Sequence, residues 1–261
     1  SAATLLPSER HPAARPARPA RPVPPAPLSP ALSKLLARLP VQDDGEALRQ
    51  SLFHSGTHFN PDLLTSEAER RARLEGVHAA LDRAESLVFL DTESTGGRNG
   101  RLIEVALVET DVEQNVTGGL HFRCNPHRRS LAGARRVHGI QDCELEHCPE
   151  FAARADELLE AVRGKTVVIH DRTMDLLWLN RELQAARPGA PRFEDRCTVV
   201  DSFVLARAIP SERRRNGLDA LLEWYGLGAR GGHHDAYGDA ALLSRVFFEL
   251  WWDLDEWLYG E

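Results

Sequence analysis

Residues 88–96 read Val88-Phe89-Leu90-Asp91-Thr92-Glu93-Ser94-Thr95-Gly96, an apolar run followed at once by two acids. A short continuous apolar run is typical of a strand that is buried on both faces. Residues two apart in a strand point to the same side, so Asp91 and Glu93 can share one cation. Two carboxylates at the mouth of a buried strand are costly without a ligand. The alternative is that they cap a loop.

Two later segments add acids and a histidine. Asp175 lies early in a predicted helix over residues 173–186, after a buried strand at 166–169. Asp239 opens an apolar helix over residues 237–253, and His234 lies in the Gly-rich approach to that helix. Oxygen ligands suit hard divalent cations such as Mg²⁺, and a histidine that titrates near neutrality can take a proton from water. Taken singly, Asp175 is equally well a first-turn helix acid and His234 an ordinary loop residue.

The periodicity of the chain predicts an α/β fold. Strands are expected at residues 87–90, 102–108, 120–124, 166–169 and 198–200, and helices at about 151–162, 173–186, 201–208, 217–225 and 237–253. We expect Gly118-Gly119 to form the turn before the third strand. Three strands followed by alternating helices and strands indicate a mixed sheet covered by helices.

The chain divides by composition into three parts. Residues 1–30 hold nine of the sixteen prolines and predict a disordered Pro/Ala/Arg-rich tail. Residues 31–85 predict a helical N-terminal extension, with a capping box at Ser66-Glu67-Ala68-Glu69. Residues 86–255 form the expected main domain.

Bulk charge and cysteine content restrict the function. The net charge of −7 argues against a protein that coats nucleic acid by bulk attraction. Handling a polyanion would then need metal ions or basic patches, for which Arg128-Arg129, Arg135-Arg136 and Arg213-Arg214-Arg215 are candidates, although such runs are more often solvated faces. No apolar run is long enough to span a membrane and no export leader is visible, so we expect a cytoplasmic protein with free thiols. A zinc site built from Cys124, His127, Cys143 and His147 or Cys148 is a weaker alternative, because its spacing is not that of a paired knuckle.

Four ordered segments together resemble the DEDD superfamily of 3′-to-5′ exonucleases, in its histidine subclass, which includes polymerase proofreading subunits, ribonuclease T and oligoribonuclease. Residues 88–96, 168–175 and 234–239 resemble its three exonuclease motifs. Val137-His138-Gly139-Ile140 is similar to a segment that lines the pocket for the terminal nucleotide. Two departures occur: the usual His-Asn-x-x-Phe-Asp reads His170-Asp171-Arg172-Thr173-Met174-Asp175, and His233 precedes His234.

The resemblance implies a ribonuclease-H-like fold with a five-stranded mixed sheet. It implies two ions per site, Mg²⁺ or Mn²⁺. Asp91, Glu93 and Asp239 would bind the first ion, Asp91 would also bridge to the second ion, and Asp175 would support the second ion. His234 would be the general base, and Thr92, Thr95 and His138 would contact the substrate.

We therefore predict a metal-dependent 3′-to-5′ exonuclease that releases nucleoside 5′-monophosphates from single-stranded or frayed 3′ ends of DNA or RNA, in proofreading, repair or turnover. The alternatives are a non-catalytic 3′-end-binding module of the same fold, an oligoribonuclease-like RNA exonuclease, and a phosphate- or metal-handling protein unrelated to nucleic acid. Because the chain ends soon after the last predicted helix, we expect a stand-alone enzyme. Association with a polymerase or repair complex is not evident from the sequence.

Overall fold

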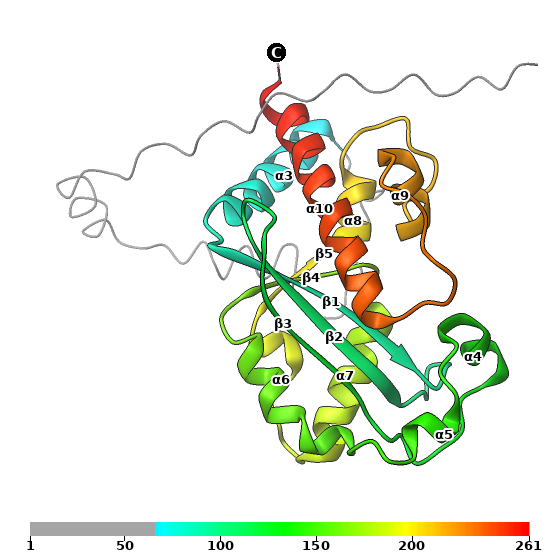
Figure 1. The fold of residues 1–261 in the computed structure, drawn as a ribbon. Helices are drawn as coiled ribbons and strands as arrows, with labels where there is room; N and C mark the ends of the chain where they lie inside the picture. Colours follow the sequence, from blue (N-terminus) through cyan, green and yellow to red (C-terminus); the bar gives the residue numbers. More distant parts are fainter. Residues whose placement is uncertain (1–65, 261) are drawn as a thin grey trace, which may run out of the picture. The chain divides into compact units, whose positions relative to one another are not determined.

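The protein is built around one five-stranded mixed sheet, seen in a computed structural model that describes residues 66–260. The strand order is β3-β2-β1-β4-β5; β1 is antiparallel to β2 and parallel to β4 (Figure 1). The strands are β1 Ser86–Ser94, β2 Leu102–Asp111, β3 Val116–Arg123, β4 Thr166–Ile169 and β5 Thr198–Asp201. The predicted mixed sheet is therefore confirmed, whereas the predictions for residues 1–30 and 31–65 lie outside the described residues.

Helices cover both faces of the sheet. They are α3 Glu67–Asp82, α4 Ala132–His138, α5 Asp142–Leu145, α6 Ala155–Ala161, α7 Thr173–Ala186, α8 Ser202–Ala208, α9 Leu218–Tyr225 and α10 Ala236–Tyr259. Helices α3, α8, α9 and α10 lie on one face and α6 and α7 on the other, while α4 and α5 lie where β1 ends (Figure 1). Among residues 66–260, no helix combines the length and the apolar character needed to cross a bilayer.

Strand β1 separates the two halves of the core. Leu87 and Phe89 belong to the cluster under α10, whereas Val88 and Leu90 belong to the cluster under α6 and α7. Both faces are buried, which explains why every residue of this run is apolar. The alternation continues past the run, so Asp91 and Glu93 point to the α10 side and Thr92 to the α7 side.

Strand β1 is longer than predicted, because its antiparallel neighbour accompanies it beyond the apolar run. The pairing with β4 ends at Phe89–Val168, but the pairing with β2 continues through Asp91–Ala106 and on to Ser94. The acids therefore lie within a strand that keeps a partner on one edge only. An apolar run in the sequence does not show how far a neighbouring strand extends.

Several expected boundaries differ from the structure. Gly118 and Gly119 lie inside β3, and the turn precedes them, with Gln114 at φ 73°. The helix predicted over residues 151–162 is a 3₁₀ turn, Phe151–Ala153, followed by α6. Helix α10 continues to Tyr259, and α4 and α5 were not predicted.

The start of α3 follows the prediction. The Ser66 hydroxyl accepts the Glu69 N–H at 3.2 Å, which is one half of the predicted capping box. The apolar face of α3 contributes Leu74, Val77 and Leu81 to the core under α10. This helix is therefore joined to the same core as the sheet.

Gly119→Ala should weaken the pairing of β2 and β3. A Cβ at Gly119 would lie 2.5 Å from the Leu107 carbonyl oxygen, so the backbone must shift. Overpacking of this kind costs about 1–3 kcal/mol in free energy of unfolding, measured by urea denaturation. Gly118→Ala is the matched control, because its nearest contact is the flexible Glu109 carboxylate at 3.4 Å. Equal loss of stability in the two variants would contradict the expectation.

Candidate metal centre

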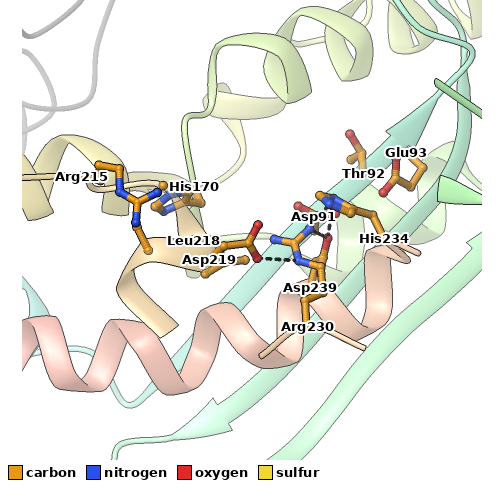
Figure 2. Close-up of a pocket in the computed structure, with 12 residues that line it drawn as sticks. Asp91, Thr92, Glu93, His170, Arg215, Leu218, Asp219, Arg230, His234 and Asp239 are labelled. Atoms are coloured by element: carbon orange, nitrogen blue, oxygen red, sulfur yellow. Dashed lines mark hydrogen bonds and ion pairs between the residues drawn. The ribbon is translucent and has the colours of Figure 1, made fainter. Parts of the chain in front are cut away.

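A pocket opens where β1 runs beyond β4. It is lined by Asp91, Thr92 and Glu93 of β1, by His170 after β4, by the start of α9, and by Arg230, His234 and Asp239 before and in α10. Figure 2 shows Asp91, Glu93, His234, Asp239 and Arg230 gathered around one space, with Arg215 and His170 further away. Segments that are distant in the sequence thus meet at one edge of the sheet.

Three of the predicted site residues form a group with metal-ligand spacing. One ligand atom from each of Glu93, His234 and Asp239 lies within 4.8 Å of the other two. Asp91 lies close enough to Asp175, Asp239 and Glu93 for each of these acids to raise its pKa. The structure therefore brings together all five residues that the sequence assigned to metal binding and proton transfer.

The first turn of α10 orients Asp239. Asp235 caps the helix through its carboxylate, which accepts the Gly238 N–H at 2.8 Å, and the Asp239 N–H donates to the Asp235 carbonyl at 2.9 Å. Asp239 is buried there and faces Glu93 across the pocket. An apolar helix that packs along β1 and β2 thus begins with a carboxylate directed at the sheet edge.

The loop before α10 determines which of the two histidines faces the carboxylates. The His234 N–H donates to the Val137 carbonyl at 2.9 Å, at the end of α4. The His233 ring lies against Gly139, where a Cβ would approach it to 2.7 Å. Gly139 also has φ 73°, a conformation that glycine adopts readily. His233 is thereby directed away from the pocket, and His234 is the residue that joins the metal-ligand group.

Thr92 holds Asp175 in place. Its hydroxyl donates to Asp175 Oδ1 at 2.6 Å, and both side chains are buried. This contact follows from strand alternation, which turns Thr92 to the α7 side, where Asp175 lies in the first turn of the helix. Thr92 also lines the pocket, so its predicted contact with substrate stays a prediction beside this structural contact.

Thr95 and His138, two further predicted substrate contacts, are buried beside the pocket. The Thr95 hydroxyl accepts the Arg101 N–H at 3.0 Å, within the loop after β1. His138 Nδ1 accepts the Ile140 N–H at 3.0 Å, and burial lowers the pKa of His138. Neither residue lines the pocket. Their substrate contacts stay predictions.

Burial is the main cause of the raised pKa values of the four acids. It raises the pKa of Asp91 well above its ordinary value, that of Glu93 to about 8, that of Asp175 to about 7 and that of Asp239 to about 6. Repulsion between neighbouring carboxylates adds to this effect. A cation among them would reverse both effects, so the group is chemically suited to bind divalent metal.

Arg230 is a functional candidate that sequence reasoning missed. Its Nη1 donates to Asp239 Oδ2 at 2.6 Å and also contacts His234 Nδ1. Its Nε lies 3.1 Å from Asp219 Oδ1, close enough for an ion pair but without the alignment of a hydrogen bond. The guanidinium lowers the pKa values of Asp91, Glu93 and Asp239. Nothing in the sequence around Arg230 indicates this inward direction, because the loop path sets it.

The basic runs are only partly available to a ligand. The guanidinium of Arg213 is buried and donates to Asp253 at 2.8 Å, so the expectation that it guides phosphate is wrong. Arg135 pairs with Asp142 at 2.7 Å. Arg215 is exposed and lines the pocket.

The structure also bears on two other features of the sequence, Asp171 in the second motif and the four cysteines. Asp171 adopts φ 58°, a left-handed conformation that Asn and Asp tolerate, so the replacement of the usual Asn fits the backbone. All four cysteines are free, and the single candidate metal group among residues 66–260 contains none of them. The alternative of a zinc site finds no support there.

The family model described as Exonuclease (RNase_T) matches residues 88–247. The chain belongs to the exonuclease family. DNA polymerase III subunit epsilon of Rickettsia felis is 34% identical to this exonuclease over 168 residues, covering 62% of the chain and 72% of the relative. The same subunit of Escherichia coli K12 is 33% identical over 172 residues, covering 62% and 70%. The predicted resemblance to 3′-to-5′ exonucleases and the enzyme class are thereby confirmed.

Solved structures agree on the fold. Apo Exonuclease I matches with a TM-score of 0.51 at 20% identity, covering 67% of this exonuclease and 42% of that chain. Exonuclease I of E. coli in complex with a dA16 oligonucleotide matches with a TM-score of 0.51 at 22% identity, covering 66% and 41%. This exonuclease thus spans about two fifths of the length of those solved chains. The likeness shows the shared ribonuclease-H-like fold.

Without divalent cations, the protein should lose stability as the pH rises from 6.5 to 8. The folded pKa values of Glu93 and Asp175, about 8 and 7, lie above those of free carboxyls, so the stability present at low pH is lost on ionisation. Calorimetry in EDTA should show a falling Tm, and excess Mg²⁺ should reverse the fall. The double variant Asp91→Asn/Glu93→Gln should flatten the dependence. A wild-type Tm in EDTA that rises over this window would contradict the assignment.

Arg230→Gln should tighten the binding of Mn²⁺. The variant removes a positive charge that shares the Asp239 carboxylate with any bound cation, so the competing ion pair is lost. Arg215→Gln is the control, because Arg215 lines the same pocket but pairs with the exposed Glu223. Mn²⁺ affinity measured by electron paramagnetic resonance should rise several-fold in the first variant and stay within about twofold in the second. Weaker binding by Arg230→Gln would show that the guanidinium supports the metal ligands.

Proposed function

We propose that this exonuclease removes nucleotides from single-stranded or frayed 3′ ends of DNA with two divalent cations, Mg²⁺ or Mn²⁺. Asp91, Glu93, Asp175 and Asp239 would hold the ions, and His234 would act as general base. The observation that supports this most directly is the convergence of Glu93, His234 and Asp239 within 4.8 Å at a pocket that Asp91 also lines.

Each residue has a distinct part in the proposed reaction. When bound, the two cations supply an activated water and stabilise the leaving oxygen of the phosphodiester. His234 accepts the proton of the attacking water, and the burial of its ring, together with the charge of Arg230, lowers the pKa of His234 and keeps it neutral at pH 7. Thr92 fixes Asp175 by its hydrogen bond. The product is a nucleoside 5′-monophosphate.

The comparisons support DNA as the substrate. Relatives over the matched region carry the name of a DNA polymerase III subunit, and a solved structure of the same fold contains the oligonucleotide dA16. Arg215 at the pocket supplies an exposed positive charge for a backbone phosphate. The relatives are named as a polymerase subunit, which also supports a cytoplasmic location and association with a polymerase as parts of this proposal, in place of the stand-alone enzyme expected from the sequence. The proposed exonuclease domain spans residues 86–255.

Asp91→Ala and His234→Ala should each abolish most of the release of mononucleotides from a 5′-labelled oligonucleotide in Mg²⁺ or Mn²⁺. Loss of a general base lowers kcat by about 10²–10⁴-fold. Asp111→Ala is the matched control, because Asp111 begins another Asp-x-Glu tripeptide but lies at the far end of β2. Undiminished release by the Asp91 variant would refute the assignment.

Three other outcomes would favour the alternatives. Binding of oligonucleotide with no product over hours in metal would identify a binding module of the same fold. A side-by-side digestion of matched single-stranded DNA, duplex DNA and RNA should favour single-stranded DNA, and preference for RNA would favour an oligoribonuclease-like enzyme. Failure to bind any oligonucleotide would leave a phosphate- or metal-handling protein.

A further inference from the structure

Glu104 is a buried carboxylate beside the pocket that the proposed reaction does not use. It lies in β2 directly opposite Glu93 of β1, next to the irregularity in the pairing after Glu93. Its relative exposure is 0%, and it does not line the pocket. A carboxylate at such a place is costly unless its oxygens are hydrogen-bonded.

The partners of Glu104 come from β3 and from α10. Oε1 accepts the Arg123 Nε–H at 2.8 Å and lies 3.1 Å from His121 Nε2, while Oε2 accepts the backbone N–H of Ala236 at 3.0 Å. Burial alone would raise the pKa of Glu104, but these hydrogen bonds outweigh it, and the pKa lies below its ordinary value. Glu104 is therefore ionised at neutral pH.

The contact with Ala236 fixes the start of α10. Ala236 is the first residue of the helix and is fully buried. Its N–H has no partner within the helix, because the first turn of an α-helix leaves its donors free. Asp239 lies three residues further on, nearly one turn away, and His234 lies two residues before. This hydrogen bond thus anchors to the sheet, opposite Glu93, the short segment that carries both residues.

We propose that Glu104 is a positioning residue: by holding the first N–H of α10 to β2, it places Asp239 and His234 at the ligand distance from Glu93 that divalent cation binding requires. This inference rests on the proposed function, since it concerns the same metal centre. Contacts outside the ligand set commonly orient metal ligands in this way.

Two variants test separately the anchoring of α10 by the Ala236 N–H and the negative charge of Glu104. Ala236→Pro removes the N–H but keeps the Glu104 carboxylate. Proline suits the first position of a helix, and the preceding Asp235, at φ −136° and ψ 140°, already has the extended conformation that proline requires. Glu104→Gln removes the charge but keeps a carbonyl oxygen that can accept the Ala236 N–H.

Glu109→Gln is the matched control. Glu109 is also a β2 glutamate with hydrogen-bonded partners, the Ser86 hydroxyl at 2.9 Å and Lys165 Nζ at 2.8 Å. It lies toward the opposite end of the strand, away from the pocket. Any general effect of losing a charged contact in β2 should appear in this variant as well.

The test is Mn²⁺ binding to the full chain, followed by electron paramagnetic resonance, with the Tm of each variant measured alongside. Ala236→Pro should weaken Mn²⁺ affinity by about 10–100-fold, the usual range for loss of an outer contact at a metal site. Glu109→Gln should lower the Tm without changing Mn²⁺ affinity.

A folded Ala236→Pro variant with wild-type Mn²⁺ affinity would overturn the inference. If that variant does not unfold cooperatively, Glu104→Ala compared with Glu104→Gln decides, because only the Gln variant keeps an acceptor for the Ala236 N–H. Weaker Mn²⁺ binding by Glu104→Ala alone, with an unchanged Glu109→Gln control, supports the positioning role; wild-type affinity of Glu104→Ala, or an equal loss in both variants, refutes it. Failure of the proposed function has a different signature, because the unaltered protein would then release no mononucleotide whatever its Mn²⁺ affinity.

Discussion

The mutual repulsion of four partly or fully buried carboxylates is the constraint on which the rest of this structure depends. Burial and like charge both raise the pKa of Asp91. The pKa values of Glu93, Asp175 and Asp239 are raised as well. A fold that tolerates this repulsion must fix each acid by contacts with neighbouring residues or backbone. Thr92 holds Asp175, the capped start of α10 holds Asp239, and the backbone of β2 holds Asp91 and Glu93. The repulsion that costs stability is also what makes the site attract divalent cations.

Strand β1 contributes site residues to both faces of the sheet. Its alternation directs Asp91 and Glu93 to α10 and Thr92 to α7, so one strand meets both helices that carry the remaining acids. Because the parallel neighbour β4 ends early while the antiparallel β2 continues, the edge of β1 is open where the acids lie. The pocket is therefore a consequence of unequal strand lengths in a mixed sheet.

Much of the fold and most of the candidate site could be predicted from the sequence. The predicted helix 173–186 coincides with α7, and the four predicted metal ligands and the predicted base lie near one another at one sheet edge. Failures occurred where a residue's environment comes from elsewhere in the chain. Gly119 lies in a strand that pairs with β2, where the Leu107 carbonyl leaves no room for a Cβ, and Arg213 is buried in a pair with Asp253. Local patterns carry no information on such partners.

The amino-acid sequence by itself determined the secondary-structure elements and the class of ligand. Apolar runs and helical spacing fix which segments are buried, and the acids and the histidine indicate a divalent cation as the ligand. Only the tertiary structure decided which other side chains contact these acids and this histidine. Arg230 turns toward Asp239, His233 turns away onto Gly139, and Glu104 reaches Ala236 across 132 positions of the chain. The physical reason is that hydrogen bonds and ion pairs act over a few ångströms in space, whereas spacing along a sequence records only the local path of the backbone.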